Sequence, residues 1–116
     1  MRYVVLIYAN PASRDVWATL SAERKQAGLA AYAELNAELA ASGELVASEA
    51  LAEGGTRLPG QFATDGPFAE AKEHLAGFYL LECADFDRAV AIAGRIPEAS
   101  LGLVEVRSVR GLQDFL

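Results

Sequence analysis

The sequence predicts a single α+β domain in which two strand–helix–strand units share one antiparallel sheet. The first observation is that short runs dense in Val, Leu, Ile and Tyr alternate with longer segments of helical periodicity. The second is that the 116 residues have the length of one domain and contain no internal repeat or linker, so residues 1–116 are treated as one unit. The third is a composition of 53% hydrophobic and 22% charged residues, which excludes a disordered chain.

The first strand is expected at Arg2–Ala9, an almost continuous apolar run. Asn10 and Pro11 end this strand, because a proline removes a donor from the sheet and holds the preceding residue extended. Ser13–Leu20 is less clear, and we expect it to hold a helical turn that carries Trp17.

A long helix is expected from Ser21 to about Ala41. Ser21 is a suitable N-cap, and Ser42-Gly43 is a typical helix end. Two polar side chains, Lys25 and Asn36, fall unusually near the apolar side of this helix. That side repeats at helical spacing and comprises Leu29, Tyr32, Leu35 and Leu39.

The middle of the chain is predicted to be extended. A second strand is expected at Glu44–Leu51, followed by a hairpin that starts at Thr56, turns at Pro59-Gly60 and returns through Thr64. A further strand is expected at Leu75–Cys83, centred on an apolar and aromatic run.

The last helix and strand complete the second unit. Asp85 is the expected N-cap of a helix that ends at Ile96-Pro97. The final strand, Leu103–Val109, places Glu105 and Arg107 on one face because side chains alternate along a strand. The apolar stripe of the helix is predicted to be Phe86, Ala89, Val90, Ala93 and Ile96.

The order strand, helix, strand, hairpin, strand, helix, strand predicts the ferredoxin-like split βαβ arrangement. In that arrangement the helices cover one face of the sheet and the other face carries Val, Leu and Tyr side chains. A bare apolar face of this size usually marks an interface. About a fifth of the residues are alanine, which limits the core of a single copy. We therefore expect a homodimer that packs sheet against sheet.

Charge and composition exclude several classes of protein. A net charge of −6 with scattered Lys and Arg argues against a nucleic-acid partner. The single Cys83 and single His74 leave too few ligands for a metal cluster, so no metal and no cofactor are expected. No apolar run reaches the length of a membrane span, and a cytoplasmic protein is expected.

The most specific motif is Thr64–Glu73, which contains Asp-Gly-Pro-Phe, followed by Leu75–Tyr79. Together with Tyr3–Tyr8, Arg95–Pro97 and Val104–Arg107, it resembles the DGPF family of YCII-related proteins over nearly the whole chain. The resemblance implies a dimeric α+β barrel. Members are largely uncharacterised, and some are associated with extracytoplasmic-function sigma factors. The wider YCII group has an assigned His–Asp pair, but this chain has no histidine on its first helix.

Two residues are candidates for acid–base chemistry. Asp65 is a carboxylate on a loop, which would act as a base or anchor a ligand. The alternative is a structural turn, since an aspartate before Gly-Pro bonds its own backbone. His74 follows within reach of the same cleft and titrates near neutrality, although a surface or interface histidine is the commoner case.

Five further residues are candidates for ligand binding: Tyr8, Lys72, Tyr79, Glu105 and Arg107. The arginine would recognise a carboxylate or phosphate, and the tyrosines would favour a flat, partly apolar ligand. The simpler alternatives are an ion pair among the charged residues and core or interface roles for the aromatic ones.

Three functions remain open from the sequence. The first is a small-molecule-binding domain or cofactor-independent enzyme with its cleft at the dimeric barrel. The second is a non-enzymatic regulatory or accessory protein, linked to an extracytoplasmic-function sigma factor, that binds a protein partner through a sheet edge or the C-terminal tail. The third is a haem- or metal-dependent oxygenase, which rests on fold analogy alone.

Overall fold

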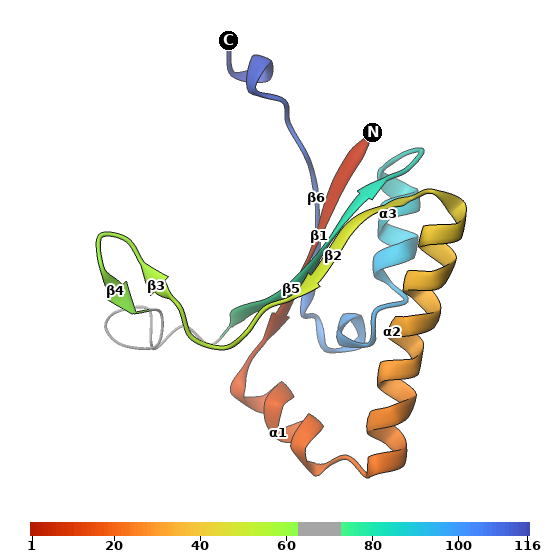
Figure 1. Cartoon of the computed structure of the whole chain (residues 1–116), viewed down its shortest axis with the longest axis vertical. Coiled ribbons are helices and arrows are strands. Elements are labelled where there is room, and N and C mark those ends of the chain that lie inside the picture. The colour runs from red at the N-terminus through yellow and green to blue at the C-terminus, as the bar shows by residue number, and fades with distance from the viewer. Residues whose placement is uncertain (63–72) are drawn as a thin grey trace.

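The computed structural model describes residues 1–62 and 73–116 and has a four-stranded antiparallel sheet (Figure 1). The strand order is β2-β5-β1-β6, with β1 at the centre beside β5. This order is the ferredoxin-like α+β arrangement that the sequence predicts. The strands are β1 (Arg2–Ala9), β2 (Leu45–Ala50), β5 (His74–Glu82) and β6 (Val104–Ser108).

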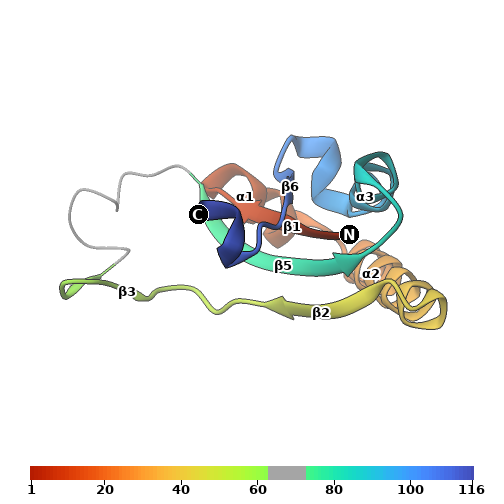
Figure 2. The same ribbon diagram turned by 90° about the horizontal axis from the view of Figure 1, so that it is seen from above.

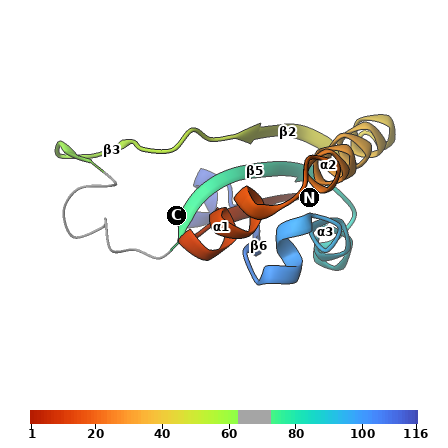
Figure 3. The same ribbon diagram turned by 90° about the horizontal axis from the view of Figure 1, so that it is seen from below.

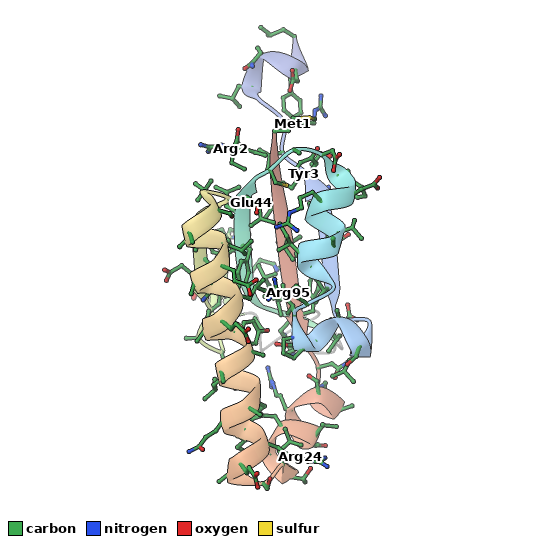
Figure 4. All side chains as sticks on the ribbon, turned by 90° about the vertical axis from the view of Figure 1, so that its right-hand side faces the viewer. Met1, Arg2, Tyr3, Arg24, Glu44 and Arg95 are labelled. Carbon is green, nitrogen blue, oxygen red and sulfur yellow. The ribbon has the colours of Figure 1, made fainter. Side chains whose placement is uncertain are left out.

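Two helices lie side by side over one face of this sheet, α2 (Ala22–Ser42) and α3 (Phe86–Ala93) (Figure 4). Both begin at the predicted N-cap: the Ser21 hydroxyl accepts from the backbone N–H of Arg24 at 3.2 Å, and the Asp85 carboxylate caps α3. Gly43, at φ +80°, ends α2 in a left-handed conformation that glycine adopts without steric cost.

The core fills the space between the sheet and these two helices. Strands β1 and β5 contribute alternate side chains, as expected for strands with one covered face. Two half-buried aliphatic residues of β6 pack against the same cluster. The buried residues of this core include Tyr3, Val5, Ile7, Leu35, Leu39, Tyr79, Leu81, Ala89, Ile92, Ala93 and Ile96.

The predicted apolar stripe of α3 is partly wrong. Helix α3 ends at Ala93 rather than at Ile96, and the side chains of Phe86 and Val90 are each 45% exposed. The helix instead turns Ile92 toward the sheet, so its buried side repeats at three- and four-residue steps. Phe86 still contacts the core edge, because its ring meets that of Tyr3 at a centroid distance of 5.9 Å.

An additional helix, α1 (Pro11–Thr19), occupies the segment for which only a helical turn was expected. Asn10 caps it: the Asn10 side chain accepts from the Ser13 N–H at 2.7 Å, and the Ser13 hydroxyl accepts from the Asn10 N–H at 2.9 Å. This reciprocal capping box and a proline at the first helical position make Asn10-Pro11 a helix start as well as a strand end.

Two segments extend away from the sheet (Figures 1 and 2). Strands β3 (Thr56–Arg57) and β4 (Gln61–Phe62) form the predicted hairpin as a separate two-stranded sheet. The expected return of this hairpin through Thr64 lies outside the described residues. The chain ends in a short 3₁₀ helix, η3 (Leu112–Phe115), which is well separated from the core.

Among residues 1–62 and 73–116, the second face of the sheet carries no helix, because α2 and α3 lie on the first face and α1 lies beyond the ends of the strands (Figures 1 and 3). We call this second face the open face. On it, Val4 lies opposite Leu80 and Leu6 lies opposite Phe78 across the β1–β5 pair. These four side chains are half-buried in a single copy. Within the part of the chain that the structure describes, no helix is long and apolar enough to cross a membrane.

Candidate functional site

The candidate site is a cavity of about 600 Å³ beyond the end of the sheet. It lies where α1 meets the N-terminal half of α2 and the 3₁₀ helix η2 (Pro97–Leu101). A volume of this size suits a small organic molecule. Its wall is mainly apolar and aromatic, formed largely by Val16, Trp17, Leu20, Leu29, Tyr32 and Leu101.

The length of α2 creates this cavity. Its 21 residues span about 30 Å at the usual rise per residue, and only the C-terminal half packs on the sheet. Leu35 and Leu39 are buried in the core, whereas Leu29 is 60% exposed in the half that extends past the strands. The predicted apolar side of α2 therefore serves two purposes, with its first part lining the cavity.

One polar pair stands in the wall of the cavity. The Tyr32 hydroxyl donates to Oε1 of Glu98 at 2.6 Å, joining α2 to η2. Burial raises the pKa of the Tyr32 phenol, and the hydrogen bond to Glu98 raises it further. Tyr32 is therefore a neutral hydrogen-bond donor throughout the physiological range. Glu98 is half-buried and follows Pro97, which starts η2.

A second cavity, of about 380 Å³, adjoins the first between α2, β2 and β5. Leu29, Tyr32 and Glu98 line both cavities, so the Tyr32–Glu98 pair lies at their junction. In the smaller cavity the Tyr79 hydroxyl donates to Oδ1 of Asn36. Burial raises the pKa of Tyr79, and the nearby charge of Glu98 acts in the same direction.

Charged side chains lie at the rim of the larger cavity. Arg14 of α1 forms a salt bridge to Glu53 at 3.2 Å. Arg24, exposed in the first turn of α2, lies where α2 meets α1 (Figure 4). Both arginines line the cavity together with Glu53, so its rim carries both signs of charge, and Glu98 lies where it adjoins the smaller cavity.

The structure divides the predicted site residues between the two faces of the sheet. Tyr79 lies on the helix-covered face and lines the smaller cavity. On the open face, the Tyr8 hydroxyl donates to Oε1 of Glu105 at 2.9 Å, and Arg107 follows two residues later in β6. The hydrogen bond to Glu105 raises the pKa of Tyr8, and burial adds to that shift. Tyr8 also lines the larger cavity.

The alternative of a Glu105–Arg107 ion pair is not supported. Glu105 accepts from Tyr8 instead, and across residues 1–62 and 73–116 Arg107 forms no salt bridge within 4 Å. His74 pairs with Ala9 at the start of β5, is half-buried, and is absent from the walls of both cavities.

Two predicted residues, Asp65 and Lys72, lie outside the described residues, as does the Asp-Gly-Pro-Phe motif itself. Their roles stay predictions. In the part of the chain that is described, no cluster of three or more His, Cys, Asp or Glu side chains is arranged to hold a metal ion.

Sequence reasoning did not assign Tyr32, Asn36 or Glu98 to a site, and it named Trp17 only as an aromatic residue that would favour a flat ligand if it bordered the cleft. Two of them carried a signal. Asn36 was noted as a polar residue near the apolar side of α2, which is where the smaller cavity opens. Trp17 belongs to a segment whose Asn-Pro-x-Ser start indicates a capped helix. Glu98 carried no such signal, because its approach to Tyr32 joins residues 66 positions apart.

Comparison with known proteins settles the family. Residues 1–113 match the profile of the YCII-related domain. The chain belongs to the YCII-related domain family. An uncharacterized protein of Rhizobium meliloti (strain 1021) is 36% identical to this YCII-related domain over 112 residues, covering 92% of this chain and 90% of that protein.

A solved structure shares the fold of this YCII-related domain. It is the 5-chloro-2-hydroxyhydroquinone dehydrochlorinase of Burkholderia phenoliruptrix AC1100, in complex with 2,5-dihydroxybenzoquinone. The TM-score is 0.54 over 98% of both chains, and the sequences are 16% identical. At this level of identity the similarity establishes the fold alone.

Proposed function

We propose that this chain binds a small, flat, partly apolar organic molecule in the larger cavity, as a ligand-binding domain or a cofactor-independent enzyme. The observation that carries the proposal is the cavity of about 600 Å³ that Trp17, Leu29 and Tyr32 line. Small-molecule sites are typically concave and mostly apolar, with a few polar groups that orient the ligand. Here the Tyr32–Glu98 pair and the two rim arginines supply those groups.

The aromatic lining favours a planar ligand. Trp17 and Tyr32 line the cavity, and aromatic rings pack well against other flat groups. The dehydrochlorinase with the same fold is solved with a flat, oxygenated ring compound, which is consistent with a ligand of this kind. The polar pair at the junction of the cavities gives an enzyme a place for proton transfer.

The test uses Trp17, the only tryptophan of the chain, as an internal reporter. Titration with hydroquinones and hydroxybenzoquinones should change its fluorescence in a saturable manner. Leu29→Arg places a charge in the cavity wall and should abolish the change. Leu112→Arg, in the exposed C-terminal helix η3, is the matched control and should bind as the wild type does. Equal binding by both variants would move the ligand out of this cavity.

A test for turnover distinguishes a cofactor-independent enzyme from a ligand-binding domain. Any compound that binds is incubated with the protein, and the mixture is analysed by mass spectrometry for a changed product. A product that forms with wild type and not with Leu29→Arg would identify an enzyme. Binding without conversion would identify a ligand-binding domain.

We also propose that the chain is a homodimer that packs through the open face. The support is the apolar strip of Val4, Leu6, Phe78 and Leu80, which no helix of the described part of the chain covers. The same face carries a carboxylate at Glu105 and a guanidinium at Arg107. Because a twofold interface is self-complementary, such a face can pair unlike charges between two copies.

A regulatory or accessory role is the second candidate, and the C-terminal segment favours it. Leu112, Phe115 and Leu116 are 87%, 68% and 105% exposed, which is unusual for large apolar residues so close together. The Arg110 guanidinium lies 4.0 Å from the ring centroid of Phe115 and the Gly111 N–H bonds Asp114, so the segment is locally ordered. The relatives described above give no support for a sigma-factor link.

This candidate is tested by deleting residues 111–116. An accessory protein that uses this segment should lose a partner in a pull-down from its own host, while Trp17 fluorescence titrations stay unchanged. Retention of every partner by the shortened chain would contradict the accessory role.

A further inference from the structure

We infer that Glu98 determines which ligand the cavity accepts, by taking a hydrogen bond from a ring hydroxyl, and that Tyr32 is the positioning residue for its carboxylate. This inference rests on the proposed function, because it assigns the ligand class to the same cavity. The ligand class is a flat, uncharged aromatic molecule that carries at least one free hydroxyl group.

The hydrogen bonding of Glu98 leaves one acceptor available. Oε1 takes the proton of the Tyr32 hydroxyl at 2.6 Å, whereas Oε2 accepts no hydrogen bond from residues 1–62 or 73–116. A carboxylate beside apolar walls is costly unless donors satisfy its oxygens. A ligand hydroxyl at Oε2 would complete the coordination of this group. A ligand without a donor would instead displace water from Oε2 and leave it unpaired.

Electrostatics narrows the ligand class further. A carboxylate repels an anionic group placed beside it, so the ligand should be uncharged at the inner end of the cavity. An ammonium group would satisfy Glu98 but would share the cavity with the guanidinium group of Arg24, whereas Arg14 is paired with Glu53. Like charges in a confined site are unfavourable. A neutral hydroxyl meets both constraints, and the rings of Trp17 and Tyr32 favour its attachment to an aromatic system.

Tyr32 restricts where Glu98 can point. Its phenol is half-buried and stays protonated, so it presents a donor to the carboxylate. Pro97 fixes the backbone at the start of η2, just before Glu98. Because Glu98 lines both cavities, we place its second oxygen within reach of a ligand in the larger one.

The experiment compares two probes, hydroquinone and 1,4-dimethoxybenzene, in which methyl groups of the second replace the hydroxyl hydrogens of the first. Both are titrated against wild type, Glu98→Ala, Glu98→Gln and Tyr32→Phe, with Trp17 fluorescence as the readout. Wild type should prefer hydroquinone by about tenfold, the value of one hydrogen bond to a charged acceptor. Glu98→Ala should reduce this preference to within about twofold by weakening hydroquinone binding alone.

The remaining variants test the roles separately. Glu98→Gln retains the shape and an acceptor but loses the charge, so its preference should fall between those of wild type and Glu98→Ala. Tyr32→Phe should lower the preference while leaving the affinity for 1,4-dimethoxybenzene unchanged, which a purely structural role would not do. Glu34→Gln, which removes an exposed carboxylate of α2 that lines neither cavity, is the control and should keep the full preference.

The outcomes distinguish this inference from the proposed function. If Glu98→Ala keeps the tenfold preference, the inference is overturned and the ligand site stands. If wild type binds both probes equally, the inference is likewise overturned and the flat-ligand proposal stands. If wild type binds neither probe, the aromatic ligand class is wrong and the proposed function fails with it. Circular dichroism of each variant establishes that the fold is retained.

Discussion

Trp17 packs so closely against Gly28 that a Cβ at residue 28 would lie 3.3 Å from Cζ3 of the indole. Because Gly28 has no side chain, the Trp17 ring of α1 packs directly against the backbone of α2 at this point. Because both residues line the larger cavity, this contact sets the position of one cavity wall. The position of the Trp17 indole thus depends on the absence of a side chain at residue 28.

Replacing this glycine separates stability from binding. Gly28→Ala removes the entropic cost of glycine inside a helix, which is about 0.5–1 kcal/mol. The added methyl group needs Trp17 to move by a few tenths of an ångström, which it can do because it is 43% exposed. We expect the free energy of unfolding to rise by about 0.5 kcal/mol, while the displaced indole weakens ligand binding. Urea unfolding and fluorescence titration measure the two effects.

Ala33→Gly, on the exposed side of α2, is the control for helix propensity and should destabilise by a similar amount. An unchanged ligand affinity in Gly28→Ala would contradict this view of the wall.

The Arg88–Glu44 pair predicts a pH-dependent stability. The Arg88 guanidinium donates to both Glu44 oxygens, at 2.9 and 2.8 Å, and holds the pKa of that carboxyl at about 2. A lowered pKa means that the contribution is complete above the pKa of the unfolded chain, near 4.5, and is lost as the pH falls toward 2. Glu44→Gln should therefore cost about 1 kcal/mol at pH 7, since Arg88 is half exposed and solvent screens the pair.

Urea unfolding of wild type and Glu44→Gln at pH 7, 5 and 3 tests this expectation. The difference in the free energy of unfolding should be steady between pH 7 and 5 and should narrow at pH 3. Glu34→Gln, which removes an exposed carboxylate on α2, should match wild type at each pH. A difference that grows on acidification would refute the role given to Glu44.

Truncation of two leucines of α2 should affect different properties, stability for Leu35 and ligand affinity for Leu29. Leu35 is 1% exposed in the core, so Leu35→Ala should lower the free energy of unfolding by about 2–5 kcal/mol. Leu29 is 60% exposed in the overhanging half of α2, so Leu29→Ala should cost less than about 1 kcal/mol and should reduce ligand affinity. Denaturant melts and titrations of both variants are the measurements. A large stability loss in Leu29→Ala would mean that the overhang belongs to the core.

The proposed dimer is tested on the open face. Sedimentation at micromolar concentration should give twice the chain mass of 12.3 kDa for wild type. Leu6→Arg introduces a charge at the centre of the apolar strip and should give a species near 12.3 kDa. Leu29→Arg, on the other side of the molecule, should remain dimeric. A wild-type protein that sediments as a monomer would exclude this interface at that concentration.

The strands and the long helix could be predicted because local patterns determine them. Ser21, Gly43 and Asp85 act where their side chains or backbone conformations are expected to act. The end of α3 was harder to predict from the sequence, since Ile96 continues the apolar periodicity beyond Ala93, where the helix stops. The buried side of that helix depends on the sheet it meets, which no local pattern describes.

The candidate site was much harder to predict than the fold. The cavity forms between the consecutive helices α1 and α2 and the sequence-distant η2, and it needs α2 to extend past the strands. Tyr79 lines the smaller cavity, and its hydrogen-bond partner there is Asn36, on a helix far from it in sequence. Tyr8 and Glu105 do contact each other, on the face opposite to Tyr79.

The overhang of α2 also bears on how this fold diversifies. Residues that bury the core lie in the half of the helix over the sheet, and residues that line the cavity lie in the half beyond it. We therefore expect substitutions in the lining to change what the cavity accepts while leaving the core in place. A single helix in this way separates a core-forming half from a cavity-lining half along its length.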